Sequence, residues 1–213
     1  MPAEANRWLY ETTGRFPRLR PVPAAHPGLP GWEAVVHEAV ENEAPAIRAA
    51  PGQYGLAPTG PAMVQLVQRC AAAGIPIVLA VRLEDGRQRQ PEDTAPELPA
   101  AAVRTLIRLD RRARLLVTHA ERSFIEEVHF GSTPDEASRI WWDISWVWGP
   151  PEDHLQQLLA TMGSDRFVFG TGQPLRIPET AVARLDLLEL ELEARQAIES
   201  GNVRSLMSAR SLA

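Results

Sequence analysis

The stretch that decides the fold is Phe167-Val-Phe-Gly-Thr-Gly-Gln-Pro174, a short apolar run that leads into two glycines and a proline. Its first residues predict a strand over Phe167–Thr171, and the glycines and the proline predict a loop after it. Outward from this stretch, strand-like and helix-like segments alternate along the whole chain. Such alternation is typical of an α/β protein in which crossover helices join the strands of a parallel sheet.

Six strands are expected, with helical patterns between them. The predicted strands are Leu19–Ala25, Ala46–Ala49, Ile77–Leu83, Ala113–Thr118, Ile140–Trp146 and Phe167–Thr171. The predicted helices, whose apolar residues recur at helical spacing, are Trp32–Val40, Pro61–Ala73, Leu155–Met162 and one or two helices from about Glu179 to Met207. Residues 1–18 are expected to be irregular, and residues 179–213 to form the C-terminal helices.

Several short blocks are similar, in their order and spacing, to the amidohydrolase-related (amidohydrolase 2) family of (β/α)8 barrels. The blocks are His26–Trp32, Ile77–Asp85, Leu115–His119, Trp142–Ser145, Asp165–Gly170 and Ile198–Asn202. The resemblance covers almost the whole chain and implies one domain, residues 1–213, built as a partial TIM-type barrel. About six of eight βα units are visible, and the missing part corresponds to the first two units of the family.

The resemblance also implies a zinc-like ion, but the chain keeps few of the expected ligands. His119 matches the family's histidine on the sixth strand. The histidine of the fifth strand falls at about Ala80, the terminal aspartate falls at Gly172, and the sequence contains no His-x-His. Because a zinc site needs three or four protein ligands, one histidine cannot form it. We therefore expect no metal and no other cofactor, since a divalent ion would lack its ligands.

Charged residues at the end of the strand Ile77–Leu83 are candidates for substrate binding, because barrel enzymes carry their functional groups at the carboxyl ends of strands. Arg82 and Glu84 share the parity of Ala80 and should point into the barrel mouth. In one interpretation Arg82, joined by Arg48, holds a carboxylate or phosphate ligand. In the other, Arg82 forms an ion-pair network with neighbouring carboxylates that stiffens the loop.

His119 and Asp143 are the candidate catalytic residues. His119 is a general base near neutral pH, a metal ligand, or a hydrogen-bonded structural histidine. Asp143 and Ser145 share one face of the predicted strand Ile140–Trp146, and family strands at this position often read Asp-x-Ser, where the pair supports the pocket. The tryptophans of this region either wall a substrate cavity or pack against helices or a partner; they are Trp141, Trp142, Trp146 and Trp148.

Composition excludes several classes of function. The formal net charge of −5 and the isoelectric point near 5.6 argue against nucleic-acid binding. The sequence has no lysine, which excludes Schiff-base and pyridoxal-phosphate chemistry. The single cysteine, Cys70, cannot form an intramolecular disulfide and is expected to be buried. The chain has neither a long apolar run nor a signal-peptide pattern, so we expect a cytoplasmic protein with no membrane segment.

Together these features predict an amidohydrolase-type hydrolase that acts on a small carboxylate-bearing compound without the usual metal. The alternative is a catalytically inactive scaffold or oligomerising protein of the same fold. Six strands of an eight-stranded barrel leave two open sheet edges, which promote association. We therefore expect a homo-oligomer, a dimer in the commonest case, unless the N-terminal segment or the terminal helices cover the edges.

Overall fold

A parallel sheet of five strands forms the centre of the molecule. The computed structural model describes residues 2–85, 89–147 and 154–208. The strands lie in sequence order and are β1 (Ile47–Ala49), β2 (Ile77–Ala80), β3 (Leu115–Thr118), β4 (Ile140–Asp143) and β5 (Phe167–Val168). Neighbouring strands are parallel throughout, with Ile77 opposite Leu115 and Leu115 opposite Ile140. The α/β class and the parallel sheet are thus confirmed.

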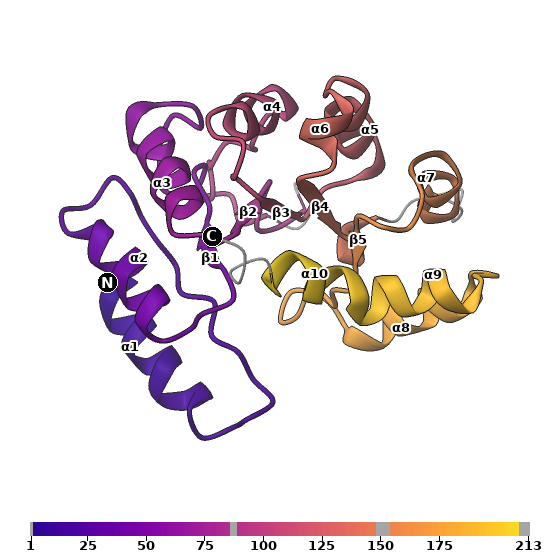
Figure 1. Ribbon diagram of the computed structural model, residues 1–213, viewed down its shortest axis with the longest axis horizontal. Helices are drawn as coiled ribbons and strands as arrows, with labels where there is room; N and C mark the ends of the chain where they lie inside the picture. Colours follow the sequence, from indigo (N-terminus) through magenta and orange to yellow (C-terminus); the bar gives the residue numbers. More distant parts are fainter. Residues whose placement is uncertain (1, 86–88, 148–153, 209–213) are drawn as a thin grey trace.

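Helices connect the strands and also form both ends of the chain (Figure 1). The connecting helices are α2 (Trp32–Glu41), α3 (Pro61–Ala72), α4 (Ala100–Arg108), α5 (Arg122–Phe130), α6 (Pro134–Ala137) and α7 (His154–Met162), and η1 (Ile144–Trp146) is a 3₁₀ turn. At the ends lie α1 (Pro2–Thr13), α8 (Pro178–Leu187), α9 (Leu192–Gln196), the π-helical turn η2 (Ala197–Gly201) and α10 (Asn202–Ser208). Figure 1 shows α3 to α7 arched over one side of the strands and α8 to α10 on the other.

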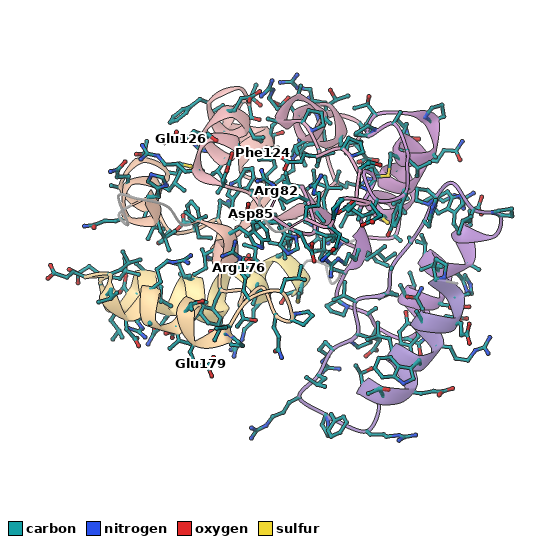
Figure 2. All side chains as sticks on the ribbon, turned by 180° about the vertical axis from the view of Figure 1, so that it is seen from behind. Arg82, Asp85, Phe124, Glu126, Arg176 and Glu179 are labelled. Carbon is teal, nitrogen blue, oxygen red and sulfur yellow. The ribbon has the colours of Figure 1, made fainter. Side chains whose placement is uncertain are left out.

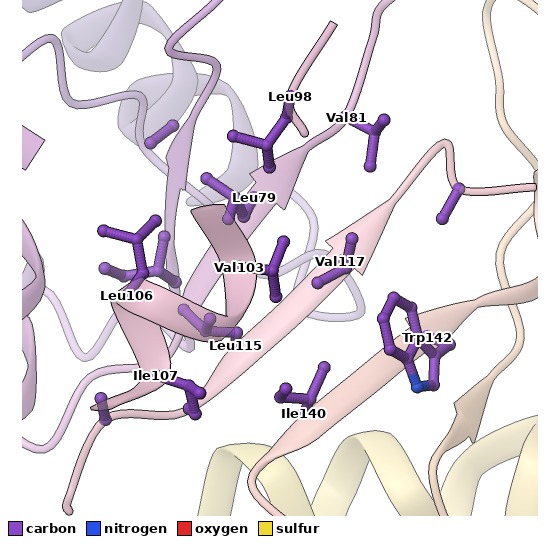
Figure 3. Close-up of a cluster of buried hydrophobic side chains, with 14 of the residues drawn as sticks. Leu79, Val81, Leu98, Val103, Leu106, Ile107, Leu115, Val117, Ile140 and Trp142 are labelled. Carbon is purple, nitrogen blue, oxygen red and sulfur yellow. The ribbon is translucent and has the colours of Figure 1, made fainter. Parts of the chain in front are cut away.

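The outer face of the sheet packs against the connecting helices and holds most of the apolar core. Alternation along each strand sends every second side chain to this face. Figure 3 shows Val103, Leu106 and Ile107 of α4 packed over strand side chains that include Leu115 and Val117, and all five side chains are fully buried. The apolar side of α4, a helix that the sequence analysis did not predict, therefore faces the sheet.

The inner face of the sheet carries a second, smaller cluster that α10 covers. Leu116, Trp141 and Val168 point to this face and pack with Leu206 of α10. At the amino end of β3, Arg114 donates hydrogen bonds to the carbonyl oxygens of Leu206, at 2.5 Å, and Gly74, at 2.6 Å. The C-terminal helix therefore occupies part of the interior that further strands would enclose in a complete barrel.

The predicted first strand, Leu19–Ala25, is reduced to one bridge, between Ala24 and Arg48 of β1. Prolines 21 and 23 have no N–H to donate, so this segment cannot form a regular ladder. Ala24 is fixed instead by Asn6 of α1, whose side-chain amide donates to the Ala24 carbonyl and accepts from the Ala24 N–H, both at 2.9 Å. The N-terminal segment, which contains α1 and Ala24, thus covers the edge of the sheet at β1.

The expectation that residues 1–18 are irregular is wrong, because α1 occupies Pro2–Thr13. The helix escaped detection because it has no apolar stripe, and Asn6 is its one buried residue in the part of the chain described here. Its position comes from the tertiary hydrogen bonds of Asn6 to Ala24 rather than from a pattern along the sequence. By contrast, α8 to α10 confirm the predicted C-terminal helices up to Ser208; residues 209–213 lie outside the described part.

The opposite edge of the sheet, at β5, is covered by the C-terminal helices. The N–H of Phe169 donates to the carbonyl of Ile198 in η2. The amide of Asn202 donates to the carbonyls of Ser164 and Phe167, both at 2.7 Å. Both edges of the sheet are therefore covered, one by the N-terminal segment and the other by the C-terminal helices. This was one of the possibilities that the sequence left open.

Candidate active site

The carboxyl ends of the strands bring the candidate residues together at one end of the inner face. Ala80 and Thr118 are opposite each other in the register of β2 and β3, and Asp143 ends β4. β2 ends at Ala80, three residues earlier than predicted, so strand parity does not extend to Glu84. Glu84 is half-buried and makes no hydrogen bond or ion pair with the residues described, so the structure does not join it to the other candidates.

His119 follows β3 directly and is held in an unusual backbone conformation. Its φ is +60°, a left-handed value that is uncommon for residues other than glycine. The side chain is 7% exposed, and its Nδ1 lies 3.3 Å from the hydroxyl oxygen of Thr118. Backbone strain of this kind is found at functional sites, where the surrounding structure maintains it.

Burial and nearby positive charge make His119 a neutral imidazole at physiological pH. Burial is the largest cause that lowers its pKa to about 4, followed by the charges of Arg48 and Arg176. A hydrogen bond with the backbone of Arg82 acts in the opposite direction, and the Arg82 charge lowers the pKa further. Because each cation disfavours the imidazolium form, an anion bound among them would raise the pKa of His119.

Trp146, in η1, packs against three of these groups. Its ring meets the His119 ring edge-on, with 5.2 Å between the ring centroids. The guanidinium carbons of Arg82 and Arg176 lie 6.0 Å and 4.2 Å from the Trp146 ring centroid. Figure 2 shows Arg82 and Arg176 in the central region of the molecule, above the C-terminal helices. One indole thus holds an imidazole and two cations in a single cluster.

Asp143 lies beside this cluster in a closely packed position. Its carboxylate accepts the N–H of Ser145 at 2.6 Å and so caps η1. Burial raises the pKa of Asp143, while the Ser145 hydrogen bonds and the Arg48 charge oppose that rise. A Cβ at Gly170 would lie 2.2 Å from the carboxylate, so only glycine fits there. Since β4 ends at Asp143, the predicted shared face of Asp143 and Ser145 is replaced by this cap.

The ion-pair interpretation of Arg82 is the one that the geometry favours, although with other partners than expected. Arg82 pairs with Glu97 at 3.0 Å and with Glu121 at 3.8 Å. Glu97 is also 3.8 Å from Arg89, so the pairs tie the loop before α4 to the mouth. Arg87, which closes the charged stretch Arg82–Arg87 of the sequence, lies outside the described residues.

Arg48 is a cation of the mouth that forms no ion pair with the described residues. It is half-buried on the inner face of β1, and within the described ranges its guanidinium has no carboxylate at ion-pair distance and no hydrogen bond. Its charge acts on His119 and Asp143 and on Tyr54 of the loop after β1. All three lie at or beyond the carboxyl ends of strands, so the Arg48 side chain reaches toward the mouth.

Arg176 is a site residue that the sequence reading missed. It follows β5 in the loop that begins at Gly172, and a Cβ at Gly172 would lie 3.1–3.3 Å from the Arg176 side-chain stem. An arginine thus covers the position at which the family resemblance implies an aspartate ligand. The rule that functional groups follow the carboxyl ends of strands pointed to this loop and could have identified Arg176.

The residues of the mouth do not fit the divalent ion that the resemblance implies. Within residues 2–85, 89–147 and 154–208, no group of three or more His, Cys, Asp or Glu side chains could hold a metal ion. The two family-matched residues, His119 and Asp143, lie in the field of the Arg48 guanidinium, which repels a cation.

The predicted tryptophan group divides between different surroundings. Trp142 lies on the outer face, edge-on to Phe124, and Trp141 lies on the inner face under Arg166, whose guanidinium carbon is 4.7 Å from the ring centroid. Trp146 is at the mouth, and Trp148 lies outside the described residues. Within the described residues, the buried Nε1 atoms of Trp141 and Trp146 have no hydrogen-bond partner. Such orphaned polar atoms are rare in folded proteins and are often satisfied by a ligand or water.

A separate cavity of about 470 Å³ lies at the opposite end of the sheet. Its lining includes Arg111 and Arg139, which precede β3 and β4, so it belongs to the amino ends of the strands. Arg108 and Arg139 at this cavity already pair with Glu136 and Asp135. In this fold, that end of the sheet contributes to stability rather than to chemistry.

Two further expectations concern other parts of the chain. Cys70 is buried, as expected. No described helix is long and apolar enough to cross a membrane.

Comparison with known proteins gives likeness in structure alone. No model of a known protein family matches the chain, and no curated protein does. Its structure resembles 2,6-dihydroxybenzoate decarboxylase from Rhizobium, with a TM-score of 0.73 and 15% identity over 97% of this chain and 76% of that chain. It also resembles an uncharacterized TIM-barrel protein from Bordetella bronchiseptica, with a TM-score of 0.72 and 15% identity over 96% of this chain and 72% of that chain. A third similar structure is an amidohydrolase candidate from Staphylococcus aureus, with a TM-score of 0.72 and 14% identity over 97% of this chain and 79% of that chain.

These likenesses confirm the fold that the sequence resemblance implied. The chain aligns over nearly its whole length with TIM-barrel proteins that include decarboxylases and an amidohydrolase candidate. At about 15% identity they establish architecture and leave the chemistry to the residues of the site. This protein is a partial TIM barrel with a cationic mouth around a neutral histidine.

Proposed function

We propose that the mouth of this barrel binds a small carboxylate-bearing compound and hydrolyses it without a divalent metal. The observation that carries the proposal is Arg48, a half-buried guanidinium that has no ion pair in the described part of the chain and lies beside His119 and Asp143. Buried charges are normally paired, so an arginine without a partner in a mouth is suited to an anionic ligand. A solved relative in fold, a 2,6-dihydroxybenzoate decarboxylase, is complexed with 2,6-dihydroxybenzoate.

In this proposal the carboxylate serves as the group that positions the substrate. It docks on Arg48, with Arg176 beside it, and neutralises the field that depresses the pKa of His119. His119 then accepts a proton from a water molecule, whose oxygen adds to the carbonyl carbon of an ester or amide. The same proton passes to the departing alcohol or amine. The ligand thus activates its own general base.

Decarboxylation is the second candidate, because relatives in fold from Rhizobium and Sphingomonas paucimobilis are decarboxylases. A carboxylate held by guanidinium groups is stabilised in the ground state, and decarboxylation must move its charge onto the carbon skeleton. That cost favours hydrolysis of a different bond in the same molecule.

Two measurements test the proposal. Calorimetry with 2,6-dihydroxybenzoate should show binding that Arg48→Gln weakens at least about 10-fold, because the charge-assisted bidentate pair is lost. Release of 4-nitrophenolate from mono-4-nitrophenyl glutarate should exceed release from neutral 4-nitrophenyl butyrate, and His119→Gln should remove it. Arg112→Gln, which breaks an exposed pair with Asp110, is the matched control.

Several results would count against it. Equal turnover of the charged and neutral esters, or binding that Arg48→Gln leaves unchanged, contradicts the role of the carboxylate. Resorcinol formed from 2,6-dihydroxybenzoate supports the decarboxylase, and binding with no turnover of any substrate supports the inactive scaffold. Elemental analysis that finds about one zinc or manganese per chain, lost in His119→Ala, contradicts the metal-free mechanism.

A further inference from the structure

The loop after β1 places a tyrosine at the barrel mouth that the sequence pattern did not reveal. Tyr54 is half-buried in this loop, which begins after Ala49, the last residue of β1. Three backbone hydrogen bonds fold the loop; they run from the N–H groups of Tyr54, Gly55 and Leu56 to the carbonyls of Ala50, Gly52 and Pro51, respectively. The loop is therefore turned tightly at the end of its own strand rather than extended into solvent.

Two neighbouring segments hold the loop and the tyrosine ring in place. The Tyr54 ring stacks on the imidazole of His26, with 4.2 Å between the ring centroids and 19° between the ring planes. His26 follows the single bridge to β1, and its Nδ1 accepts the N–H of Gly28 at 3.2 Å. A Cβ at Gly52 would lie 2.1 Å from the carbonyl oxygen of Pro96, so the loop before α4 is in direct contact with the loop after β1. The phenol is thus held in one orientation before any ligand binds, which lowers the entropy cost of binding.

The hydroxyl of Tyr54 lies near the Arg48 guanidinium at the carboxyl end of β1. Burial raises the pKa of Tyr54, while a hydrogen bond from the backbone of Ala50 and the charge of Arg48 oppose that rise. Ala50 directly follows β1, so the hydroxyl lies at the same end of the sheet as His119, on which the Arg48 charge also acts. Among the described residues, the Tyr54 O–H meets no acceptor and the Arg48 guanidinium meets no carboxylate. Two hydrogen-bond donors therefore lie close together at the mouth, and neither is used within the described chain.

We infer that Tyr54 binds the substrate carboxylate together with Arg48, with the guanidinium and the Tyr54 O–H both donating to the carboxylate oxygens. This inference rests on the function proposed above and adds a second donor to its carboxylate site. The two oxygens of a carboxylate offer about four lone-pair positions, so they accept from a guanidinium and a hydroxyl at once. Both hydrogen bonds are charge-assisted, which makes each roughly twice as strong as a bond between neutral groups.

Calorimetry with glutarate and with 2,6-dihydroxybenzoate tests the pair in the full chain. Tyr54→Phe removes the hydroxyl but keeps the ring that stacks on His26, and it should weaken binding of both compounds about 10-fold. In a chain that already carries Arg48→Gln, the same change should weaken binding less than about 3-fold, because the carboxylate is no longer held beside Tyr54. The matched control is Tyr10→Phe, which removes the hydroxyl of the other tyrosine, on α1, and should leave binding unchanged.

Fluorine NMR observes the Tyr54 ring directly. The chain has two tyrosines, so the Tyr10→Phe protein grown with 3-fluorotyrosine carries its single label at Tyr54. Glutarate has no aromatic ring current, and at saturation it should shift the fluorine resonance because the neighbouring O–H gains an acceptor. Arg48→Gln should reduce this shift at the same glutarate concentration. If Tyr54→Phe fails to fold by far-UV circular dichroism, the fluorine resonance alone decides.

The outcomes separate this inference from the function on which it rests. Binding that Arg48→Gln weakens but Tyr54→Phe leaves unchanged overturns the inference, while the proposed function stands. An equal cost of Tyr54→Phe with and without Arg48, or a fluorine resonance that saturating glutarate leaves in place, also overturns it. If neither compound binds the wild type, the proposed function fails, and this inference fails with it.

Discussion

The buried imidazole of His119 makes the stability of the protein depend on pH. A histidine of the unfolded chain binds a proton near pH 6.5, whereas folded His119, with a pKa of about 4, does not. Between these values the unfolded state holds more protons, so the free energy of unfolding contributed by His119 rises with pH from about 4 to about 6.5. His119→Gln should remove up to about 3 kcal/mol of this dependence in urea unfolding, whereas His37→Gln, at an exposed position on α2, should retain it.

At the same scale, Gly170 should tolerate no side chain. Gly170→Ala would place a methyl group 2.2 Å from the Asp143 carboxylate and should destabilise the protein by about 1–3 kcal/mol in denaturant unfolding. The control is Gly201→Ala, because a Cβ there has its nearest neighbour at 3.6 Å. If the carboxylate is the cause, Asp143→Ala should reduce the cost of Gly170→Ala in a double-mutant cycle; an additive result would contradict this account.

At the scale of elements, one asparagine at each flank anchors a terminal helix to the sheet. Asn6→Ala would leave the N–H and C=O of Ala24 without their side-chain partner, and Asn202→Ala would remove the side-chain amide that donates to the carbonyls of Ser164 and Phe167. Each change should cost about 2–4 kcal/mol, since an unmade buried hydrogen bond costs about 1–3 kcal/mol. Hydrogen exchange should accelerate at β1 in the first variant and at β5 in the second.

Asn42→Ala is the matched control for both variants. Asn42 also donates to a backbone carbonyl, that of Glu38, but does so at the solvent-exposed end of α2. Its loss should change the free energy of unfolding by less than about 1 kcal/mol, because water replaces the partner. If Asn42→Ala costs as much as Asn6→Ala, burial is not the source of the effect.

At the scale of the whole molecule, α10 closes the inner face of an incomplete barrel. Leu206 is fully buried against Leu116, Trp141 and Val168, so Leu206→Ala should cost about 2–5 kcal/mol. Hydrogen exchange should increase in α10 before it increases in β3, because the outer core remains intact. Val40→Ala, at an exposed position, is the control, and uniform loss of protection over the whole sheet would contradict the division into two clusters.

The sequence predicted the strands of the sheet and the helices α2, α3, α7 and those after β5, but it did not predict the exact ends of the strands or the helices α1, α4, α5 and α6. Apolar runs and helical stripes are local patterns, and they located all five strands that formed. The ends of strands depended on tertiary contacts: β4 stops at Asp143 because its carboxylate caps η1. Local pattern also failed for α1, whose anchor is a single asparagine bonded 18 residues away.

Of the candidate site, the sequence identified His119, Asp143, Arg48 and Arg82 through their places at strand ends. It did not show that Arg82 pairs with Glu97 and Glu121, or that Arg176 lies over Gly172. These contacts join loops that are distant in sequence, and side-chain direction in a loop follows no period. The type of a residue and its parity along a strand therefore predict that it lies at the barrel mouth, but they do not predict which side chains it contacts there.

By itself, then, the sequence determined that this chain is a parallel α/β barrel fragment with an acidic net charge and too few metal ligands of the family pattern. Those properties follow from local periodicity and from the identity of single residues. Only the tertiary structure decided that both sheet edges are covered by the chain's own ends, that Arg48 is left without a partner among the described residues, and that burial, together with three guanidinium groups, holds His119 neutral. The physical reason is that electrostatic fields and hydrogen bonds depend on distances between segments, and packing of the whole chain sets those distances.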